Sequence, residues 1–309
     1  MEFLIAPDRL ELAEAVRDFL AGTHGPEVLR KLDGANRDPE IWNGLVEMGL
    51  PGLLIPEEHG GLGMGLLDAA LVARECGRFA VAEPLVESAF VMAPWLMAKG
   101  ETGDLASIAS GEARPTSAHV INGWQSDGEG AALDSVDPLR NLTALPQDAS
   151  DDPHMLNLGA LMSAAQLIGL AEAMLDQAVE YGKVREQFGQ PIGGFQAIKH
   201  KLADVAVALE FARPVLWRAA QSMDDELDSA ALHVSHAKLA ASDAAYLSAE
   251  SAIQVHGAMG YTYEVDLHFW MKRSWALAGA WGSRGFHARR VDEAVFDAAS
   301  AIGPQHTFA

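Results

Sequence analysis

The sequence predicts a mainly α-helical protein in which a short middle segment separates two helical regions. Apolar residues recur at helical spacing from Pro7 to about Gly100 and again from about His154 to the C-terminus, and this spacing is typical of amphipathic helices. Residues 103–152 are instead punctuated by Gly, Pro, Ser and Asp, which favour turns and loops. We therefore expect an N-terminal helical domain at 1–102, a reduced middle segment at 103–153 and a C-terminal helical bundle at 154–309.

The N-terminal region is predicted to consist of short helices. Residues 10–20 carry apolar side chains at helical spacing, and glycine or proline breaks follow at Gly22, Gly25, Pro51-Gly52 and the glycine-rich stretch 57–65. These breaks divide the helical region into several segments.

The middle segment is predicted to be either a few strands of a reduced domain or a long connection. Only Thr116–Ile121 has the composition of a strand. The whole segment is about half the roughly 100 residues of a typical β-sandwich, so it cannot form a complete one.

The C-terminal region is predicted to be a bundle of long helices. Three are expected at about 154–181, 195–223 and 227–257, followed by a shorter pair at about 264–280 and 284–301. The third is rich in Ala and Ser, which let neighbouring helices approach closely. Asp151 and Asp152 stand where the dipole of the first long helix favours negative charge.

Composition excludes several classes of function. Lys and Arg number 22 against 43 Asp and Glu, giving a formal net charge of −21, and such a surface repels nucleic acid and anionic lipid. Cys76 is the single cysteine, which excludes an internal disulfide and a cysteine-rich zinc site. The N-terminus lacks a signal-peptide pattern, and we expect no uncharged apolar run near the roughly 18–20 residues of a membrane span. We predict a cytoplasmic protein with no metal site that binds neither nucleic acid nor a membrane.

Two stretches carry residue types suited to a nucleotide. Residues 181–196 place Arg185, Gln187 and Phe188 close together before a glycine. A guanidinium offers a planar fork of donors to a phosphate, and an aromatic ring offers a face to a purine. On composition alone, however, Arg185 could be a solvated surface residue and Phe188 a core residue.

In the second stretch, Gly257 and Gly260 are expected to end the third long helix. Backbone without side chains lets a ligand come close, although glycines also end many helices that bind nothing. His256 has no matched carboxylate or cysteine nearby in the sequence, and we interpret it as a packed or capping histidine.

Together these stretches resemble the acyl-CoA dehydrogenase family. The resemblance rests on Tyr-x-x-x-Arg-x-Gln-Phe-Gly-x-Pro-Ile, starting at Tyr181, and on Gln-Val-His-Gly-Ala-Met-Gly-Tyr-Thr-Tyr-Glu, starting at Gln254. Residues 48–63 are similar to the family's first-domain signature. The resemblance implies an N-terminal helical domain, a middle β domain, a C-terminal four-helix bundle, and an FAD-dependent enzyme. Such an enzyme oxidises the α–β bond of an acyl-CoA with a carboxylate as base, and an electron-transferring flavoprotein usually accepts the electrons.

In the family, the flavin ring lies within one subunit and the ADP half of FAD reaches the bundle of a neighbour. The resemblance assigns a clamp for this ADP half, with Arg185 at the pyrophosphate, to the following residues: Arg185, Gln187, Phe188, Ile192, Gln254, Gly257 and Ala258. Ala258 stands where many relatives have a second glycine. Glu264 matches one family position of the catalytic base, but the same local pattern also occurs where the glutamate only supports helix structure. The other base position is Gly159 here.

The short middle segment leaves little protein to cover a flavin ring. We therefore hypothesise a truncated, non-catalytic subunit of a heteromeric acyl-CoA dehydrogenase, of the actinobacterial steroid-degrading type. A full-length partner subunit would supply the β domain and the base in a heterotetramer. Two alternatives remain open: a self-sufficient homo-oligomeric acyl-CoA dehydrogenase with Glu264 as its base, and a cofactor-free helical scaffold.

Overall fold

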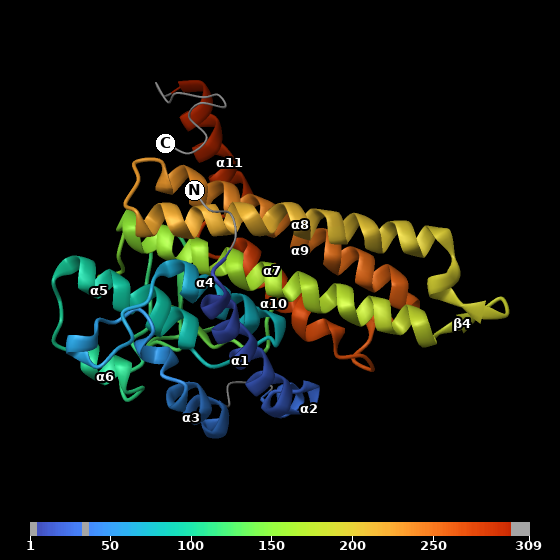
Figure 1. The fold of residues 1–309 in the computed structure, drawn as a ribbon, viewed down its shortest axis with the longest axis horizontal. Helices are drawn as coiled ribbons and strands as arrows, with labels where there is room; N and C mark the ends of the chain where they lie inside the picture. Colours follow the sequence, from blue (N-terminus) through green and yellow to red (C-terminus); the bar gives the residue numbers. More distant parts are fainter. Residues whose placement is uncertain (1–4, 33–36, 298–309) are drawn as a thin grey trace.

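The structure, a computed structural model, describes residues 5–32 and 37–297. It is mainly helical, with a small sheet between two helical regions, as the sequence predicts (Figure 1). Within the described residues, the N-terminal region contains six α-helices, two short 3-10 turns (η1 and η2) and one π-helix (η3): α1 (Pro7–Thr23), α2 (Pro26–Lys31), α3 (Pro39–Glu47), η1 (Leu50–Gly52), η2 (Glu57–His59), α4 (Leu66–Arg78), η3 (Val86–Met92), α5 (Ala93–Lys99) and α6 (Leu105–Ala109). Helices α1, α2 and α3 each begin with a proline. Proline lacks a backbone N–H, and it is favourable there because the N–H groups of the first helical turn have no partner within the helix.

The middle segment forms a three-stranded antiparallel sheet. Its strands are β1 (Trp124–Ser126), β2 (Ala132–Leu133) and β3 (Leu142–Ala144), in the order β1-β3-β2. The expected strand at Thr116–Ile121 is wrong, since only isolated bridges occur there, at Ala118 and His119. The chain turns at this point instead: the Asn122 N–H donates to the His119 carbonyl at 3.0 Å.

Buried ion pairs fix this small sheet to both helical regions. Asp137 pairs with Arg273 of the C-terminal region at 2.7 Å, and both side chains are buried. Arg140 pairs with Glu87 of η3 at 2.9 Å, and its guanidinium lies 4.4 Å from the centre of the Trp124 ring. Few apolar side chains hold the segment, so these polar contacts fix its position.

The C-terminal region is a helical bundle. Its helices are α7 (Pro153–Val184), α8 (Gln196–Asp224), α9 (Ala230–His256) and the shorter α10 (Leu267–Gly279), followed by α11 (Arg284–Asp292) and the turn η6 (Glu293–Asp297). The Asp152 carboxylate accepts the His154 N–H at 2.8 Å and so caps the start of α7. The predicted helix bounds agree within a few residues, except that residues 298–301 of the last predicted helix lie outside the described part of the chain.

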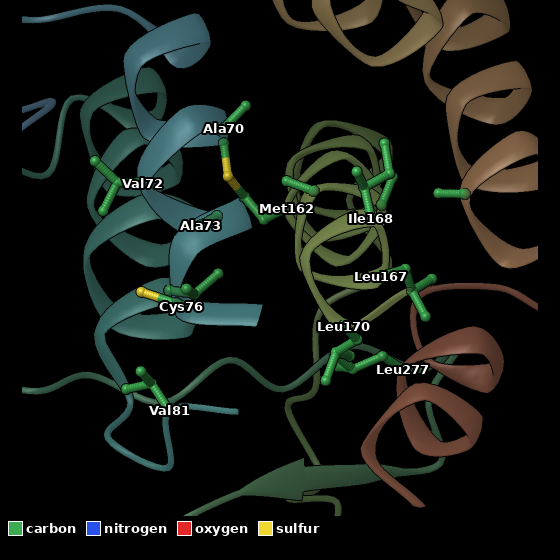
Figure 2. Close-up of a cluster of buried hydrophobic side chains, with 14 of the residues drawn as sticks. Ala70, Val72, Ala73, Cys76, Val81, Met162, Leu167, Ile168, Leu170 and Leu277 are labelled. Carbon is green, nitrogen blue, oxygen red and sulfur yellow. The ribbon is translucent and has the colours of Figure 1, made fainter. Parts of the chain in front are cut away.

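Helix α7 is the central element, because it contacts α4 on one side and α8, α9 and α10 on the others. Figure 2 shows Met162 of α7 directed toward Ala70 of α4, while Leu170 lies near Leu277 of α10. These contacts join the N-terminal helices and the bundle into one hydrophobic core.

The expectation that no apolar run approaches a membrane span is wrong for α7. By length and composition, this helix is long and apolar enough to cross a membrane. However, 89% of its most apolar 18-residue stretch is buried within the protein. A central core helix needs apolar residues on all sides, and this accounts for its composition.

The buried histidines predict acid sensitivity. Burial lowers the pKa of His24, His233 and His287 to about 4. Between pH 6.5 and 4 the unfolded chain therefore binds protons that the folded chain excludes, so the free energy of unfolding should fall on acidification by about 3 kcal/mol per histidine across this window. Urea unfolding measured from pH 7 to pH 4 checks this.

The variant His287→Asn should reduce the pH slope, and His200→Asn, at an exposed position, should not. A free energy of unfolding that is constant between pH 6.5 and 4 would contradict the prediction.

Candidate functional site

The structure brings the two predicted stretches together at one end of the bundle. The chain leaves α7 at Val184 and α9 at His256, and the Tyr181 ring stacks on His256 with centroids 4.4 Å apart. The Tyr181 hydroxyl also donates to Met259 Sδ at 3.7 Å. Segments more than 70 residues apart in sequence thus form one surface.

His256 has the packed role that the sequence predicts. Its Nδ1 donates to the Ala252 carbonyl at 2.8 Å, one turn back in α9. Burial lowers the pKa of this histidine, which keeps the ring neutral against Tyr181. The stacking pair itself was not predicted, since neither residue is near the other in sequence.

A short hairpin projects from the end of α7 (Figure 1). It consists of β4 (Glu186–Gln187) and β5 (Gln190–Pro191), and the Ile192 N–H donates to the Arg185 carbonyl at 2.8 Å to close it. Arg185 is therefore the first residue outside α7, at the base of the hairpin. Its side chain is exposed, and no carboxylate in the described residues pairs with its guanidinium.

Phe188 lies at the tip of this hairpin in a strained conformation. Both turn residues have positive φ, +54° at Phe188 and +82° at Gly189, a geometry that favours Asn-Gly. The Phe188 side chain is 93% exposed, and its ring contact in the described residues is edge-on to Phe195 at 6.2 Å. An exposed aromatic ring in a strained position stabilises little within the chain, so the ring is free to contact a ligand or a partner.

Gln254 and Gly257 form the second part of the site at this end of the helical bundle. Gln254 is exposed in the last turn of α9, and Gly257 follows with φ +62°. A Cβ placed on Gly257 would meet nothing within 4 Å, so its backbone faces open space. Ala258 is exposed in the next turn, η5 (Gly257–Tyr261).

The end of the bundle is locally basic in an otherwise acidic chain. Residues 185–201 include Arg185, Lys199 and Lys201 against the single acid Glu186. Local positive charge raises the concentration of anionic ligands near a surface. This part of the chain is therefore suited to phosphate groups.

A hollow of about 520 Å³ lies between α7 and α8 at the base of the hairpin. Its lining is largely apolar: Val179, Gly182, Lys183, Pro191, Gly193, Ile198, Lys199 and Leu202. The close approach of two glycines shapes it, because a Cβ on Gly193 would lie 2.9 Å from the Gly182 carbonyl oxygen. The sequence did not predict this hollow, which depends on how Gly182 near the end of α7 and Gly193 after the hairpin meet.

Neither candidate base position holds a buried carboxylate in this structure. Glu264 is exposed in the loop before α10, and its N–H donates to Thr262 Oγ1 at 3.3 Å. A base that removes an α proton needs a site from which water is excluded. At Gly159, a Cβ would lie 2.1 Å from the buried Trp281 ring, so no carboxylate side chain fits there.

The cavity beneath the middle segment is small. It measures about 40 Å³ and lies among Arg37, Glu83, Glu87, Ser126, Arg140 and Arg273. Ligand pockets for drug-sized molecules are about 300–1,000 Å³. A flavin ring or an acyl chain does not fit in this cavity.

Cys76 is buried in α4, and burial raises the pKa of its thiol to about 12. Within residues 5–32 and 37–297, no cluster of His, Cys, Asp and Glu could hold a metal ion.

Comparison with known proteins agrees with this architecture. Family models for the acyl-CoA dehydrogenase N-terminal and C-terminal domains match residues 6–101 and 153–296. The acyl-CoA dehydrogenase IpdE2 of Mycobacterium tuberculosis is 33% identical, over 94% of this chain and 98% of that protein. The chain belongs to the acyl-CoA dehydrogenase family.

This acyl-CoA dehydrogenase chain also shares its fold with solved structures. A chain of the ChsE4-ChsE5 complex from Mycobacterium tuberculosis superposes with a TM-score of 0.83 at 23% identity, covering 96% of this chain and all of that one. A chain of the Tcur3481-Tcur3483 steroid acyl-CoA dehydrogenase, a G363A variant, has a TM-score of 0.81 at 22% identity, covering 95% and 99%. At these identities the likeness shows the fold.

Proposed function

We propose that this chain is a non-catalytic subunit of a heteromeric acyl-CoA dehydrogenase and binds the ADP half of an FAD whose ring lies in a partner subunit. The single observation that carries the proposal is an asymmetry. The two motifs meet at an exposed end of the bundle, whereas the cavity beneath the middle segment measures about 40 Å³.

The residues at the clamp end fit the ADP half of FAD. The Arg185 guanidinium has no carboxylate partner among the described residues and can bind a pyrophosphate in a bidentate manner. The exposed Phe188 ring can stack on adenine, with Gln187 and Ile192 beside it on the same hairpin. Gln254, Gly257 and Ala258 would hold the other side, where the open backbone at Gly257 allows close approach.

The isoalloxazine half does not fit this chain. A short three-stranded sheet, fixed by the Asp137–Arg273 and Arg140–Glu87 pairs, lies directly on the helices. FAD, when bound, supplies the ring that accepts the electrons of acyl-CoA oxidation. That ring and the catalytic base would therefore belong to a full-length partner with a complete β domain.

The partner and substrate follow from the relatives. Among these, one solved structure is a complex of two differently named chains, ChsE4 and ChsE5, and another is described as a steroid acyl-CoA dehydrogenase. We extend both properties to this chain: a cytoplasmic heterotetramer that introduces a double bond into a steroid side-chain CoA thioester and passes electrons to an electron-transferring flavoprotein. We also propose that the N-terminal helical domain ends near residue 102 and that the C-terminal bundle begins after residue 153.

Flavin stoichiometry tests the proposal. This chain is co-expressed with a full-length acyl-CoA dehydrogenase from the same genome, and FAD absorbance is compared with protein mass in the purified complex. We expect one FAD for every two chains and a colourless protein when this chain is expressed alone. A ratio near one FAD per chain, or a yellow homo-oligomer that an acyl-CoA bleaches, would favour the self-sufficient alternative.

Glu264 provides a second test. Its exposure before α10 supports a role at the helix N-terminus, where an acid is favourable. We expect Glu264→Gln to change the turnover number of the co-purified complex by less than about threefold, because removing a general base typically costs 10²–10⁴-fold. A loss of about 100-fold or more would place the base in this chain. The corresponding glutamine variant of the partner's own base serves as the positive control.

A further inference from the structure

Trp281, between α10 and α11, combines two properties that rarely occur together. Its side chain is buried, with 2% exposed, and its backbone is left-handed, with φ +58°. A bulky residue in this region is strained and persists only where the surrounding structure holds it.

Three elements hold the turn that contains Trp281. The Trp281 N–H donates to Asn122 Oδ1 of the middle segment at 2.6 Å, and His287 Nε2 of α11 donates to the Trp281 carbonyl at 2.9 Å. The buried Lys238 of α9 donates its Nζ to the Leu277 carbonyl at the end of α10. The strained turn is therefore fixed from three sides.

This turn places the indole against α7. An ideal Cβ on Gly159 would lie 2.1 Å from Cδ2 of Trp281 and 2.3 Å from Cε2, so only glycine leaves room for the ring. The His119 ring of the middle segment lies on the indole at 5.9 Å between centroids. The indole thus fills the space between α7 and the middle segment.

We propose that Trp281 is an internal plug: its indole fills the space between α7 and the middle segment, and this space accepts a flat aromatic ligand once the side chain is removed. This inference rests on the proposed function, since a subunit without catalysis of its own can fill this space with its own side chain. In the wild-type complex the plug confines acyl-CoA binding to the partner.

The first test uses alanine at Gly159. In the wild type, Gly159→Ala should lower Tm by about 3 °C or more, because the new methyl group overlaps the indole. In a Trp281→Gly background the same change should raise Tm by about 1–2 °C, because alanine is the better helix former. Gly182→Ala, in the same helix, is the matched control, because a Cβ there would lie an ordinary 3.6 Å from its nearest neighbour. This change should shift Tm equally in both backgrounds.

The second test uses indole as the probe. Trp281→Gly keeps the left-handed turn, and indole at about ten times its dissociation constant should raise the Tm of this variant by about 3 °C. The wild type and Trp275→Ala, which removes a half-exposed indole from α10, should show no shift. If Trp281→Gly does not fold, Trp281→Phe replaces it, and Gly159→Ala should then lower Tm by less than in the wild type.

The proposal is overturned if Gly159→Ala changes Tm equally with and without Trp281, or if indole leaves the Tm of Trp281→Gly unchanged. Both measurements need no FAD or partner, so their outcome is separate from the flavin stoichiometry that tests the proposed function. A wild-type chain that carries its own flavin would reject the proposed function and leave the Trp281–Gly159 contact intact.

Discussion

Replacing Arg185 with alanine is expected to weaken FAD binding by the co-purified complex by about 10- to 100-fold, because hydrogen bonds to a charged group contribute about 1.5–3 kcal/mol each. The guanidinium lies at the base of the exposed hairpin with no carboxylate partner in the described part of the chain, so its removal leaves no buried charge behind. The complex should therefore stay assembled while FAD is lost. Fluorescence titration of the apo-complex with FAD measures the effect.

Lys183→Ala is the matched control, since it removes the same charge two residues away. Lys183 pairs with Glu180 at 2.5 Å and is not part of the proposed clamp, so FAD affinity should change by less than about threefold, as for an exposed ion pair. If Arg185→Ala retains FAD as well as Lys183→Ala does, the chain is a scaffold that stabilises its partner without binding the cofactor.

Among the variants considered, Glu172→Ala in α7 should lower the free energy of unfolding most, by about 3–5 kcal/mol. The Glu172 carboxylate is only 4% exposed and pairs at 2.8 Å with both Arg74 of α4 and Arg213 of α8. Arg78 of α4 lies 3.6 Å away. Removing the carboxylate leaves partly buried arginines facing one another between the N-terminal helices and the bundle.

Glu180→Ala, in the same helix, is the control for Glu172→Ala. The Glu180 carboxylate is 68% exposed, and its pair with Lys183 lies at the surface, where ion pairs contribute about 0–1 kcal/mol. Urea unfolding of both variants should differ by at least 2–3 kcal/mol. If both variants lose the same free energy of unfolding, the pairs between Glu172 and the three arginines do not stabilise the fold.

Helical periodicity predicted the bundle well because its helices are long. Over α7, α8 and α9, many turns repeat the same apolar spacing, and a local error in one turn does not change the interpretation. Gly257 also predicted where α9 ends. The strand expected at Thr116–Ile121 failed because six residues offer few repeats, and contacts with distant residues turn the chain at His119.

The residues of the proposed clamp were recognisable by motif, but their arrangement in space was not. The sequence showed Arg185, Phe188, Gln254 and Gly257 in the right order, whereas the stacking of Tyr181 on His256 joins the two motifs only in three dimensions. The strain at Phe188 likewise arises from the two-residue turn of the hairpin.

The sequence by itself determined the family, the helical architecture and the residues available to hold a nucleotide, because these depend on local spacing and on motifs within short stretches. Only the tertiary structure decided which sites are open. Trp281 meets Gly159 from more than 120 positions away in the sequence and leaves no room for a side chain there, while the end of the bundle stays exposed. Whether a site is open depends on how distant side chains pack, and no local pattern records it.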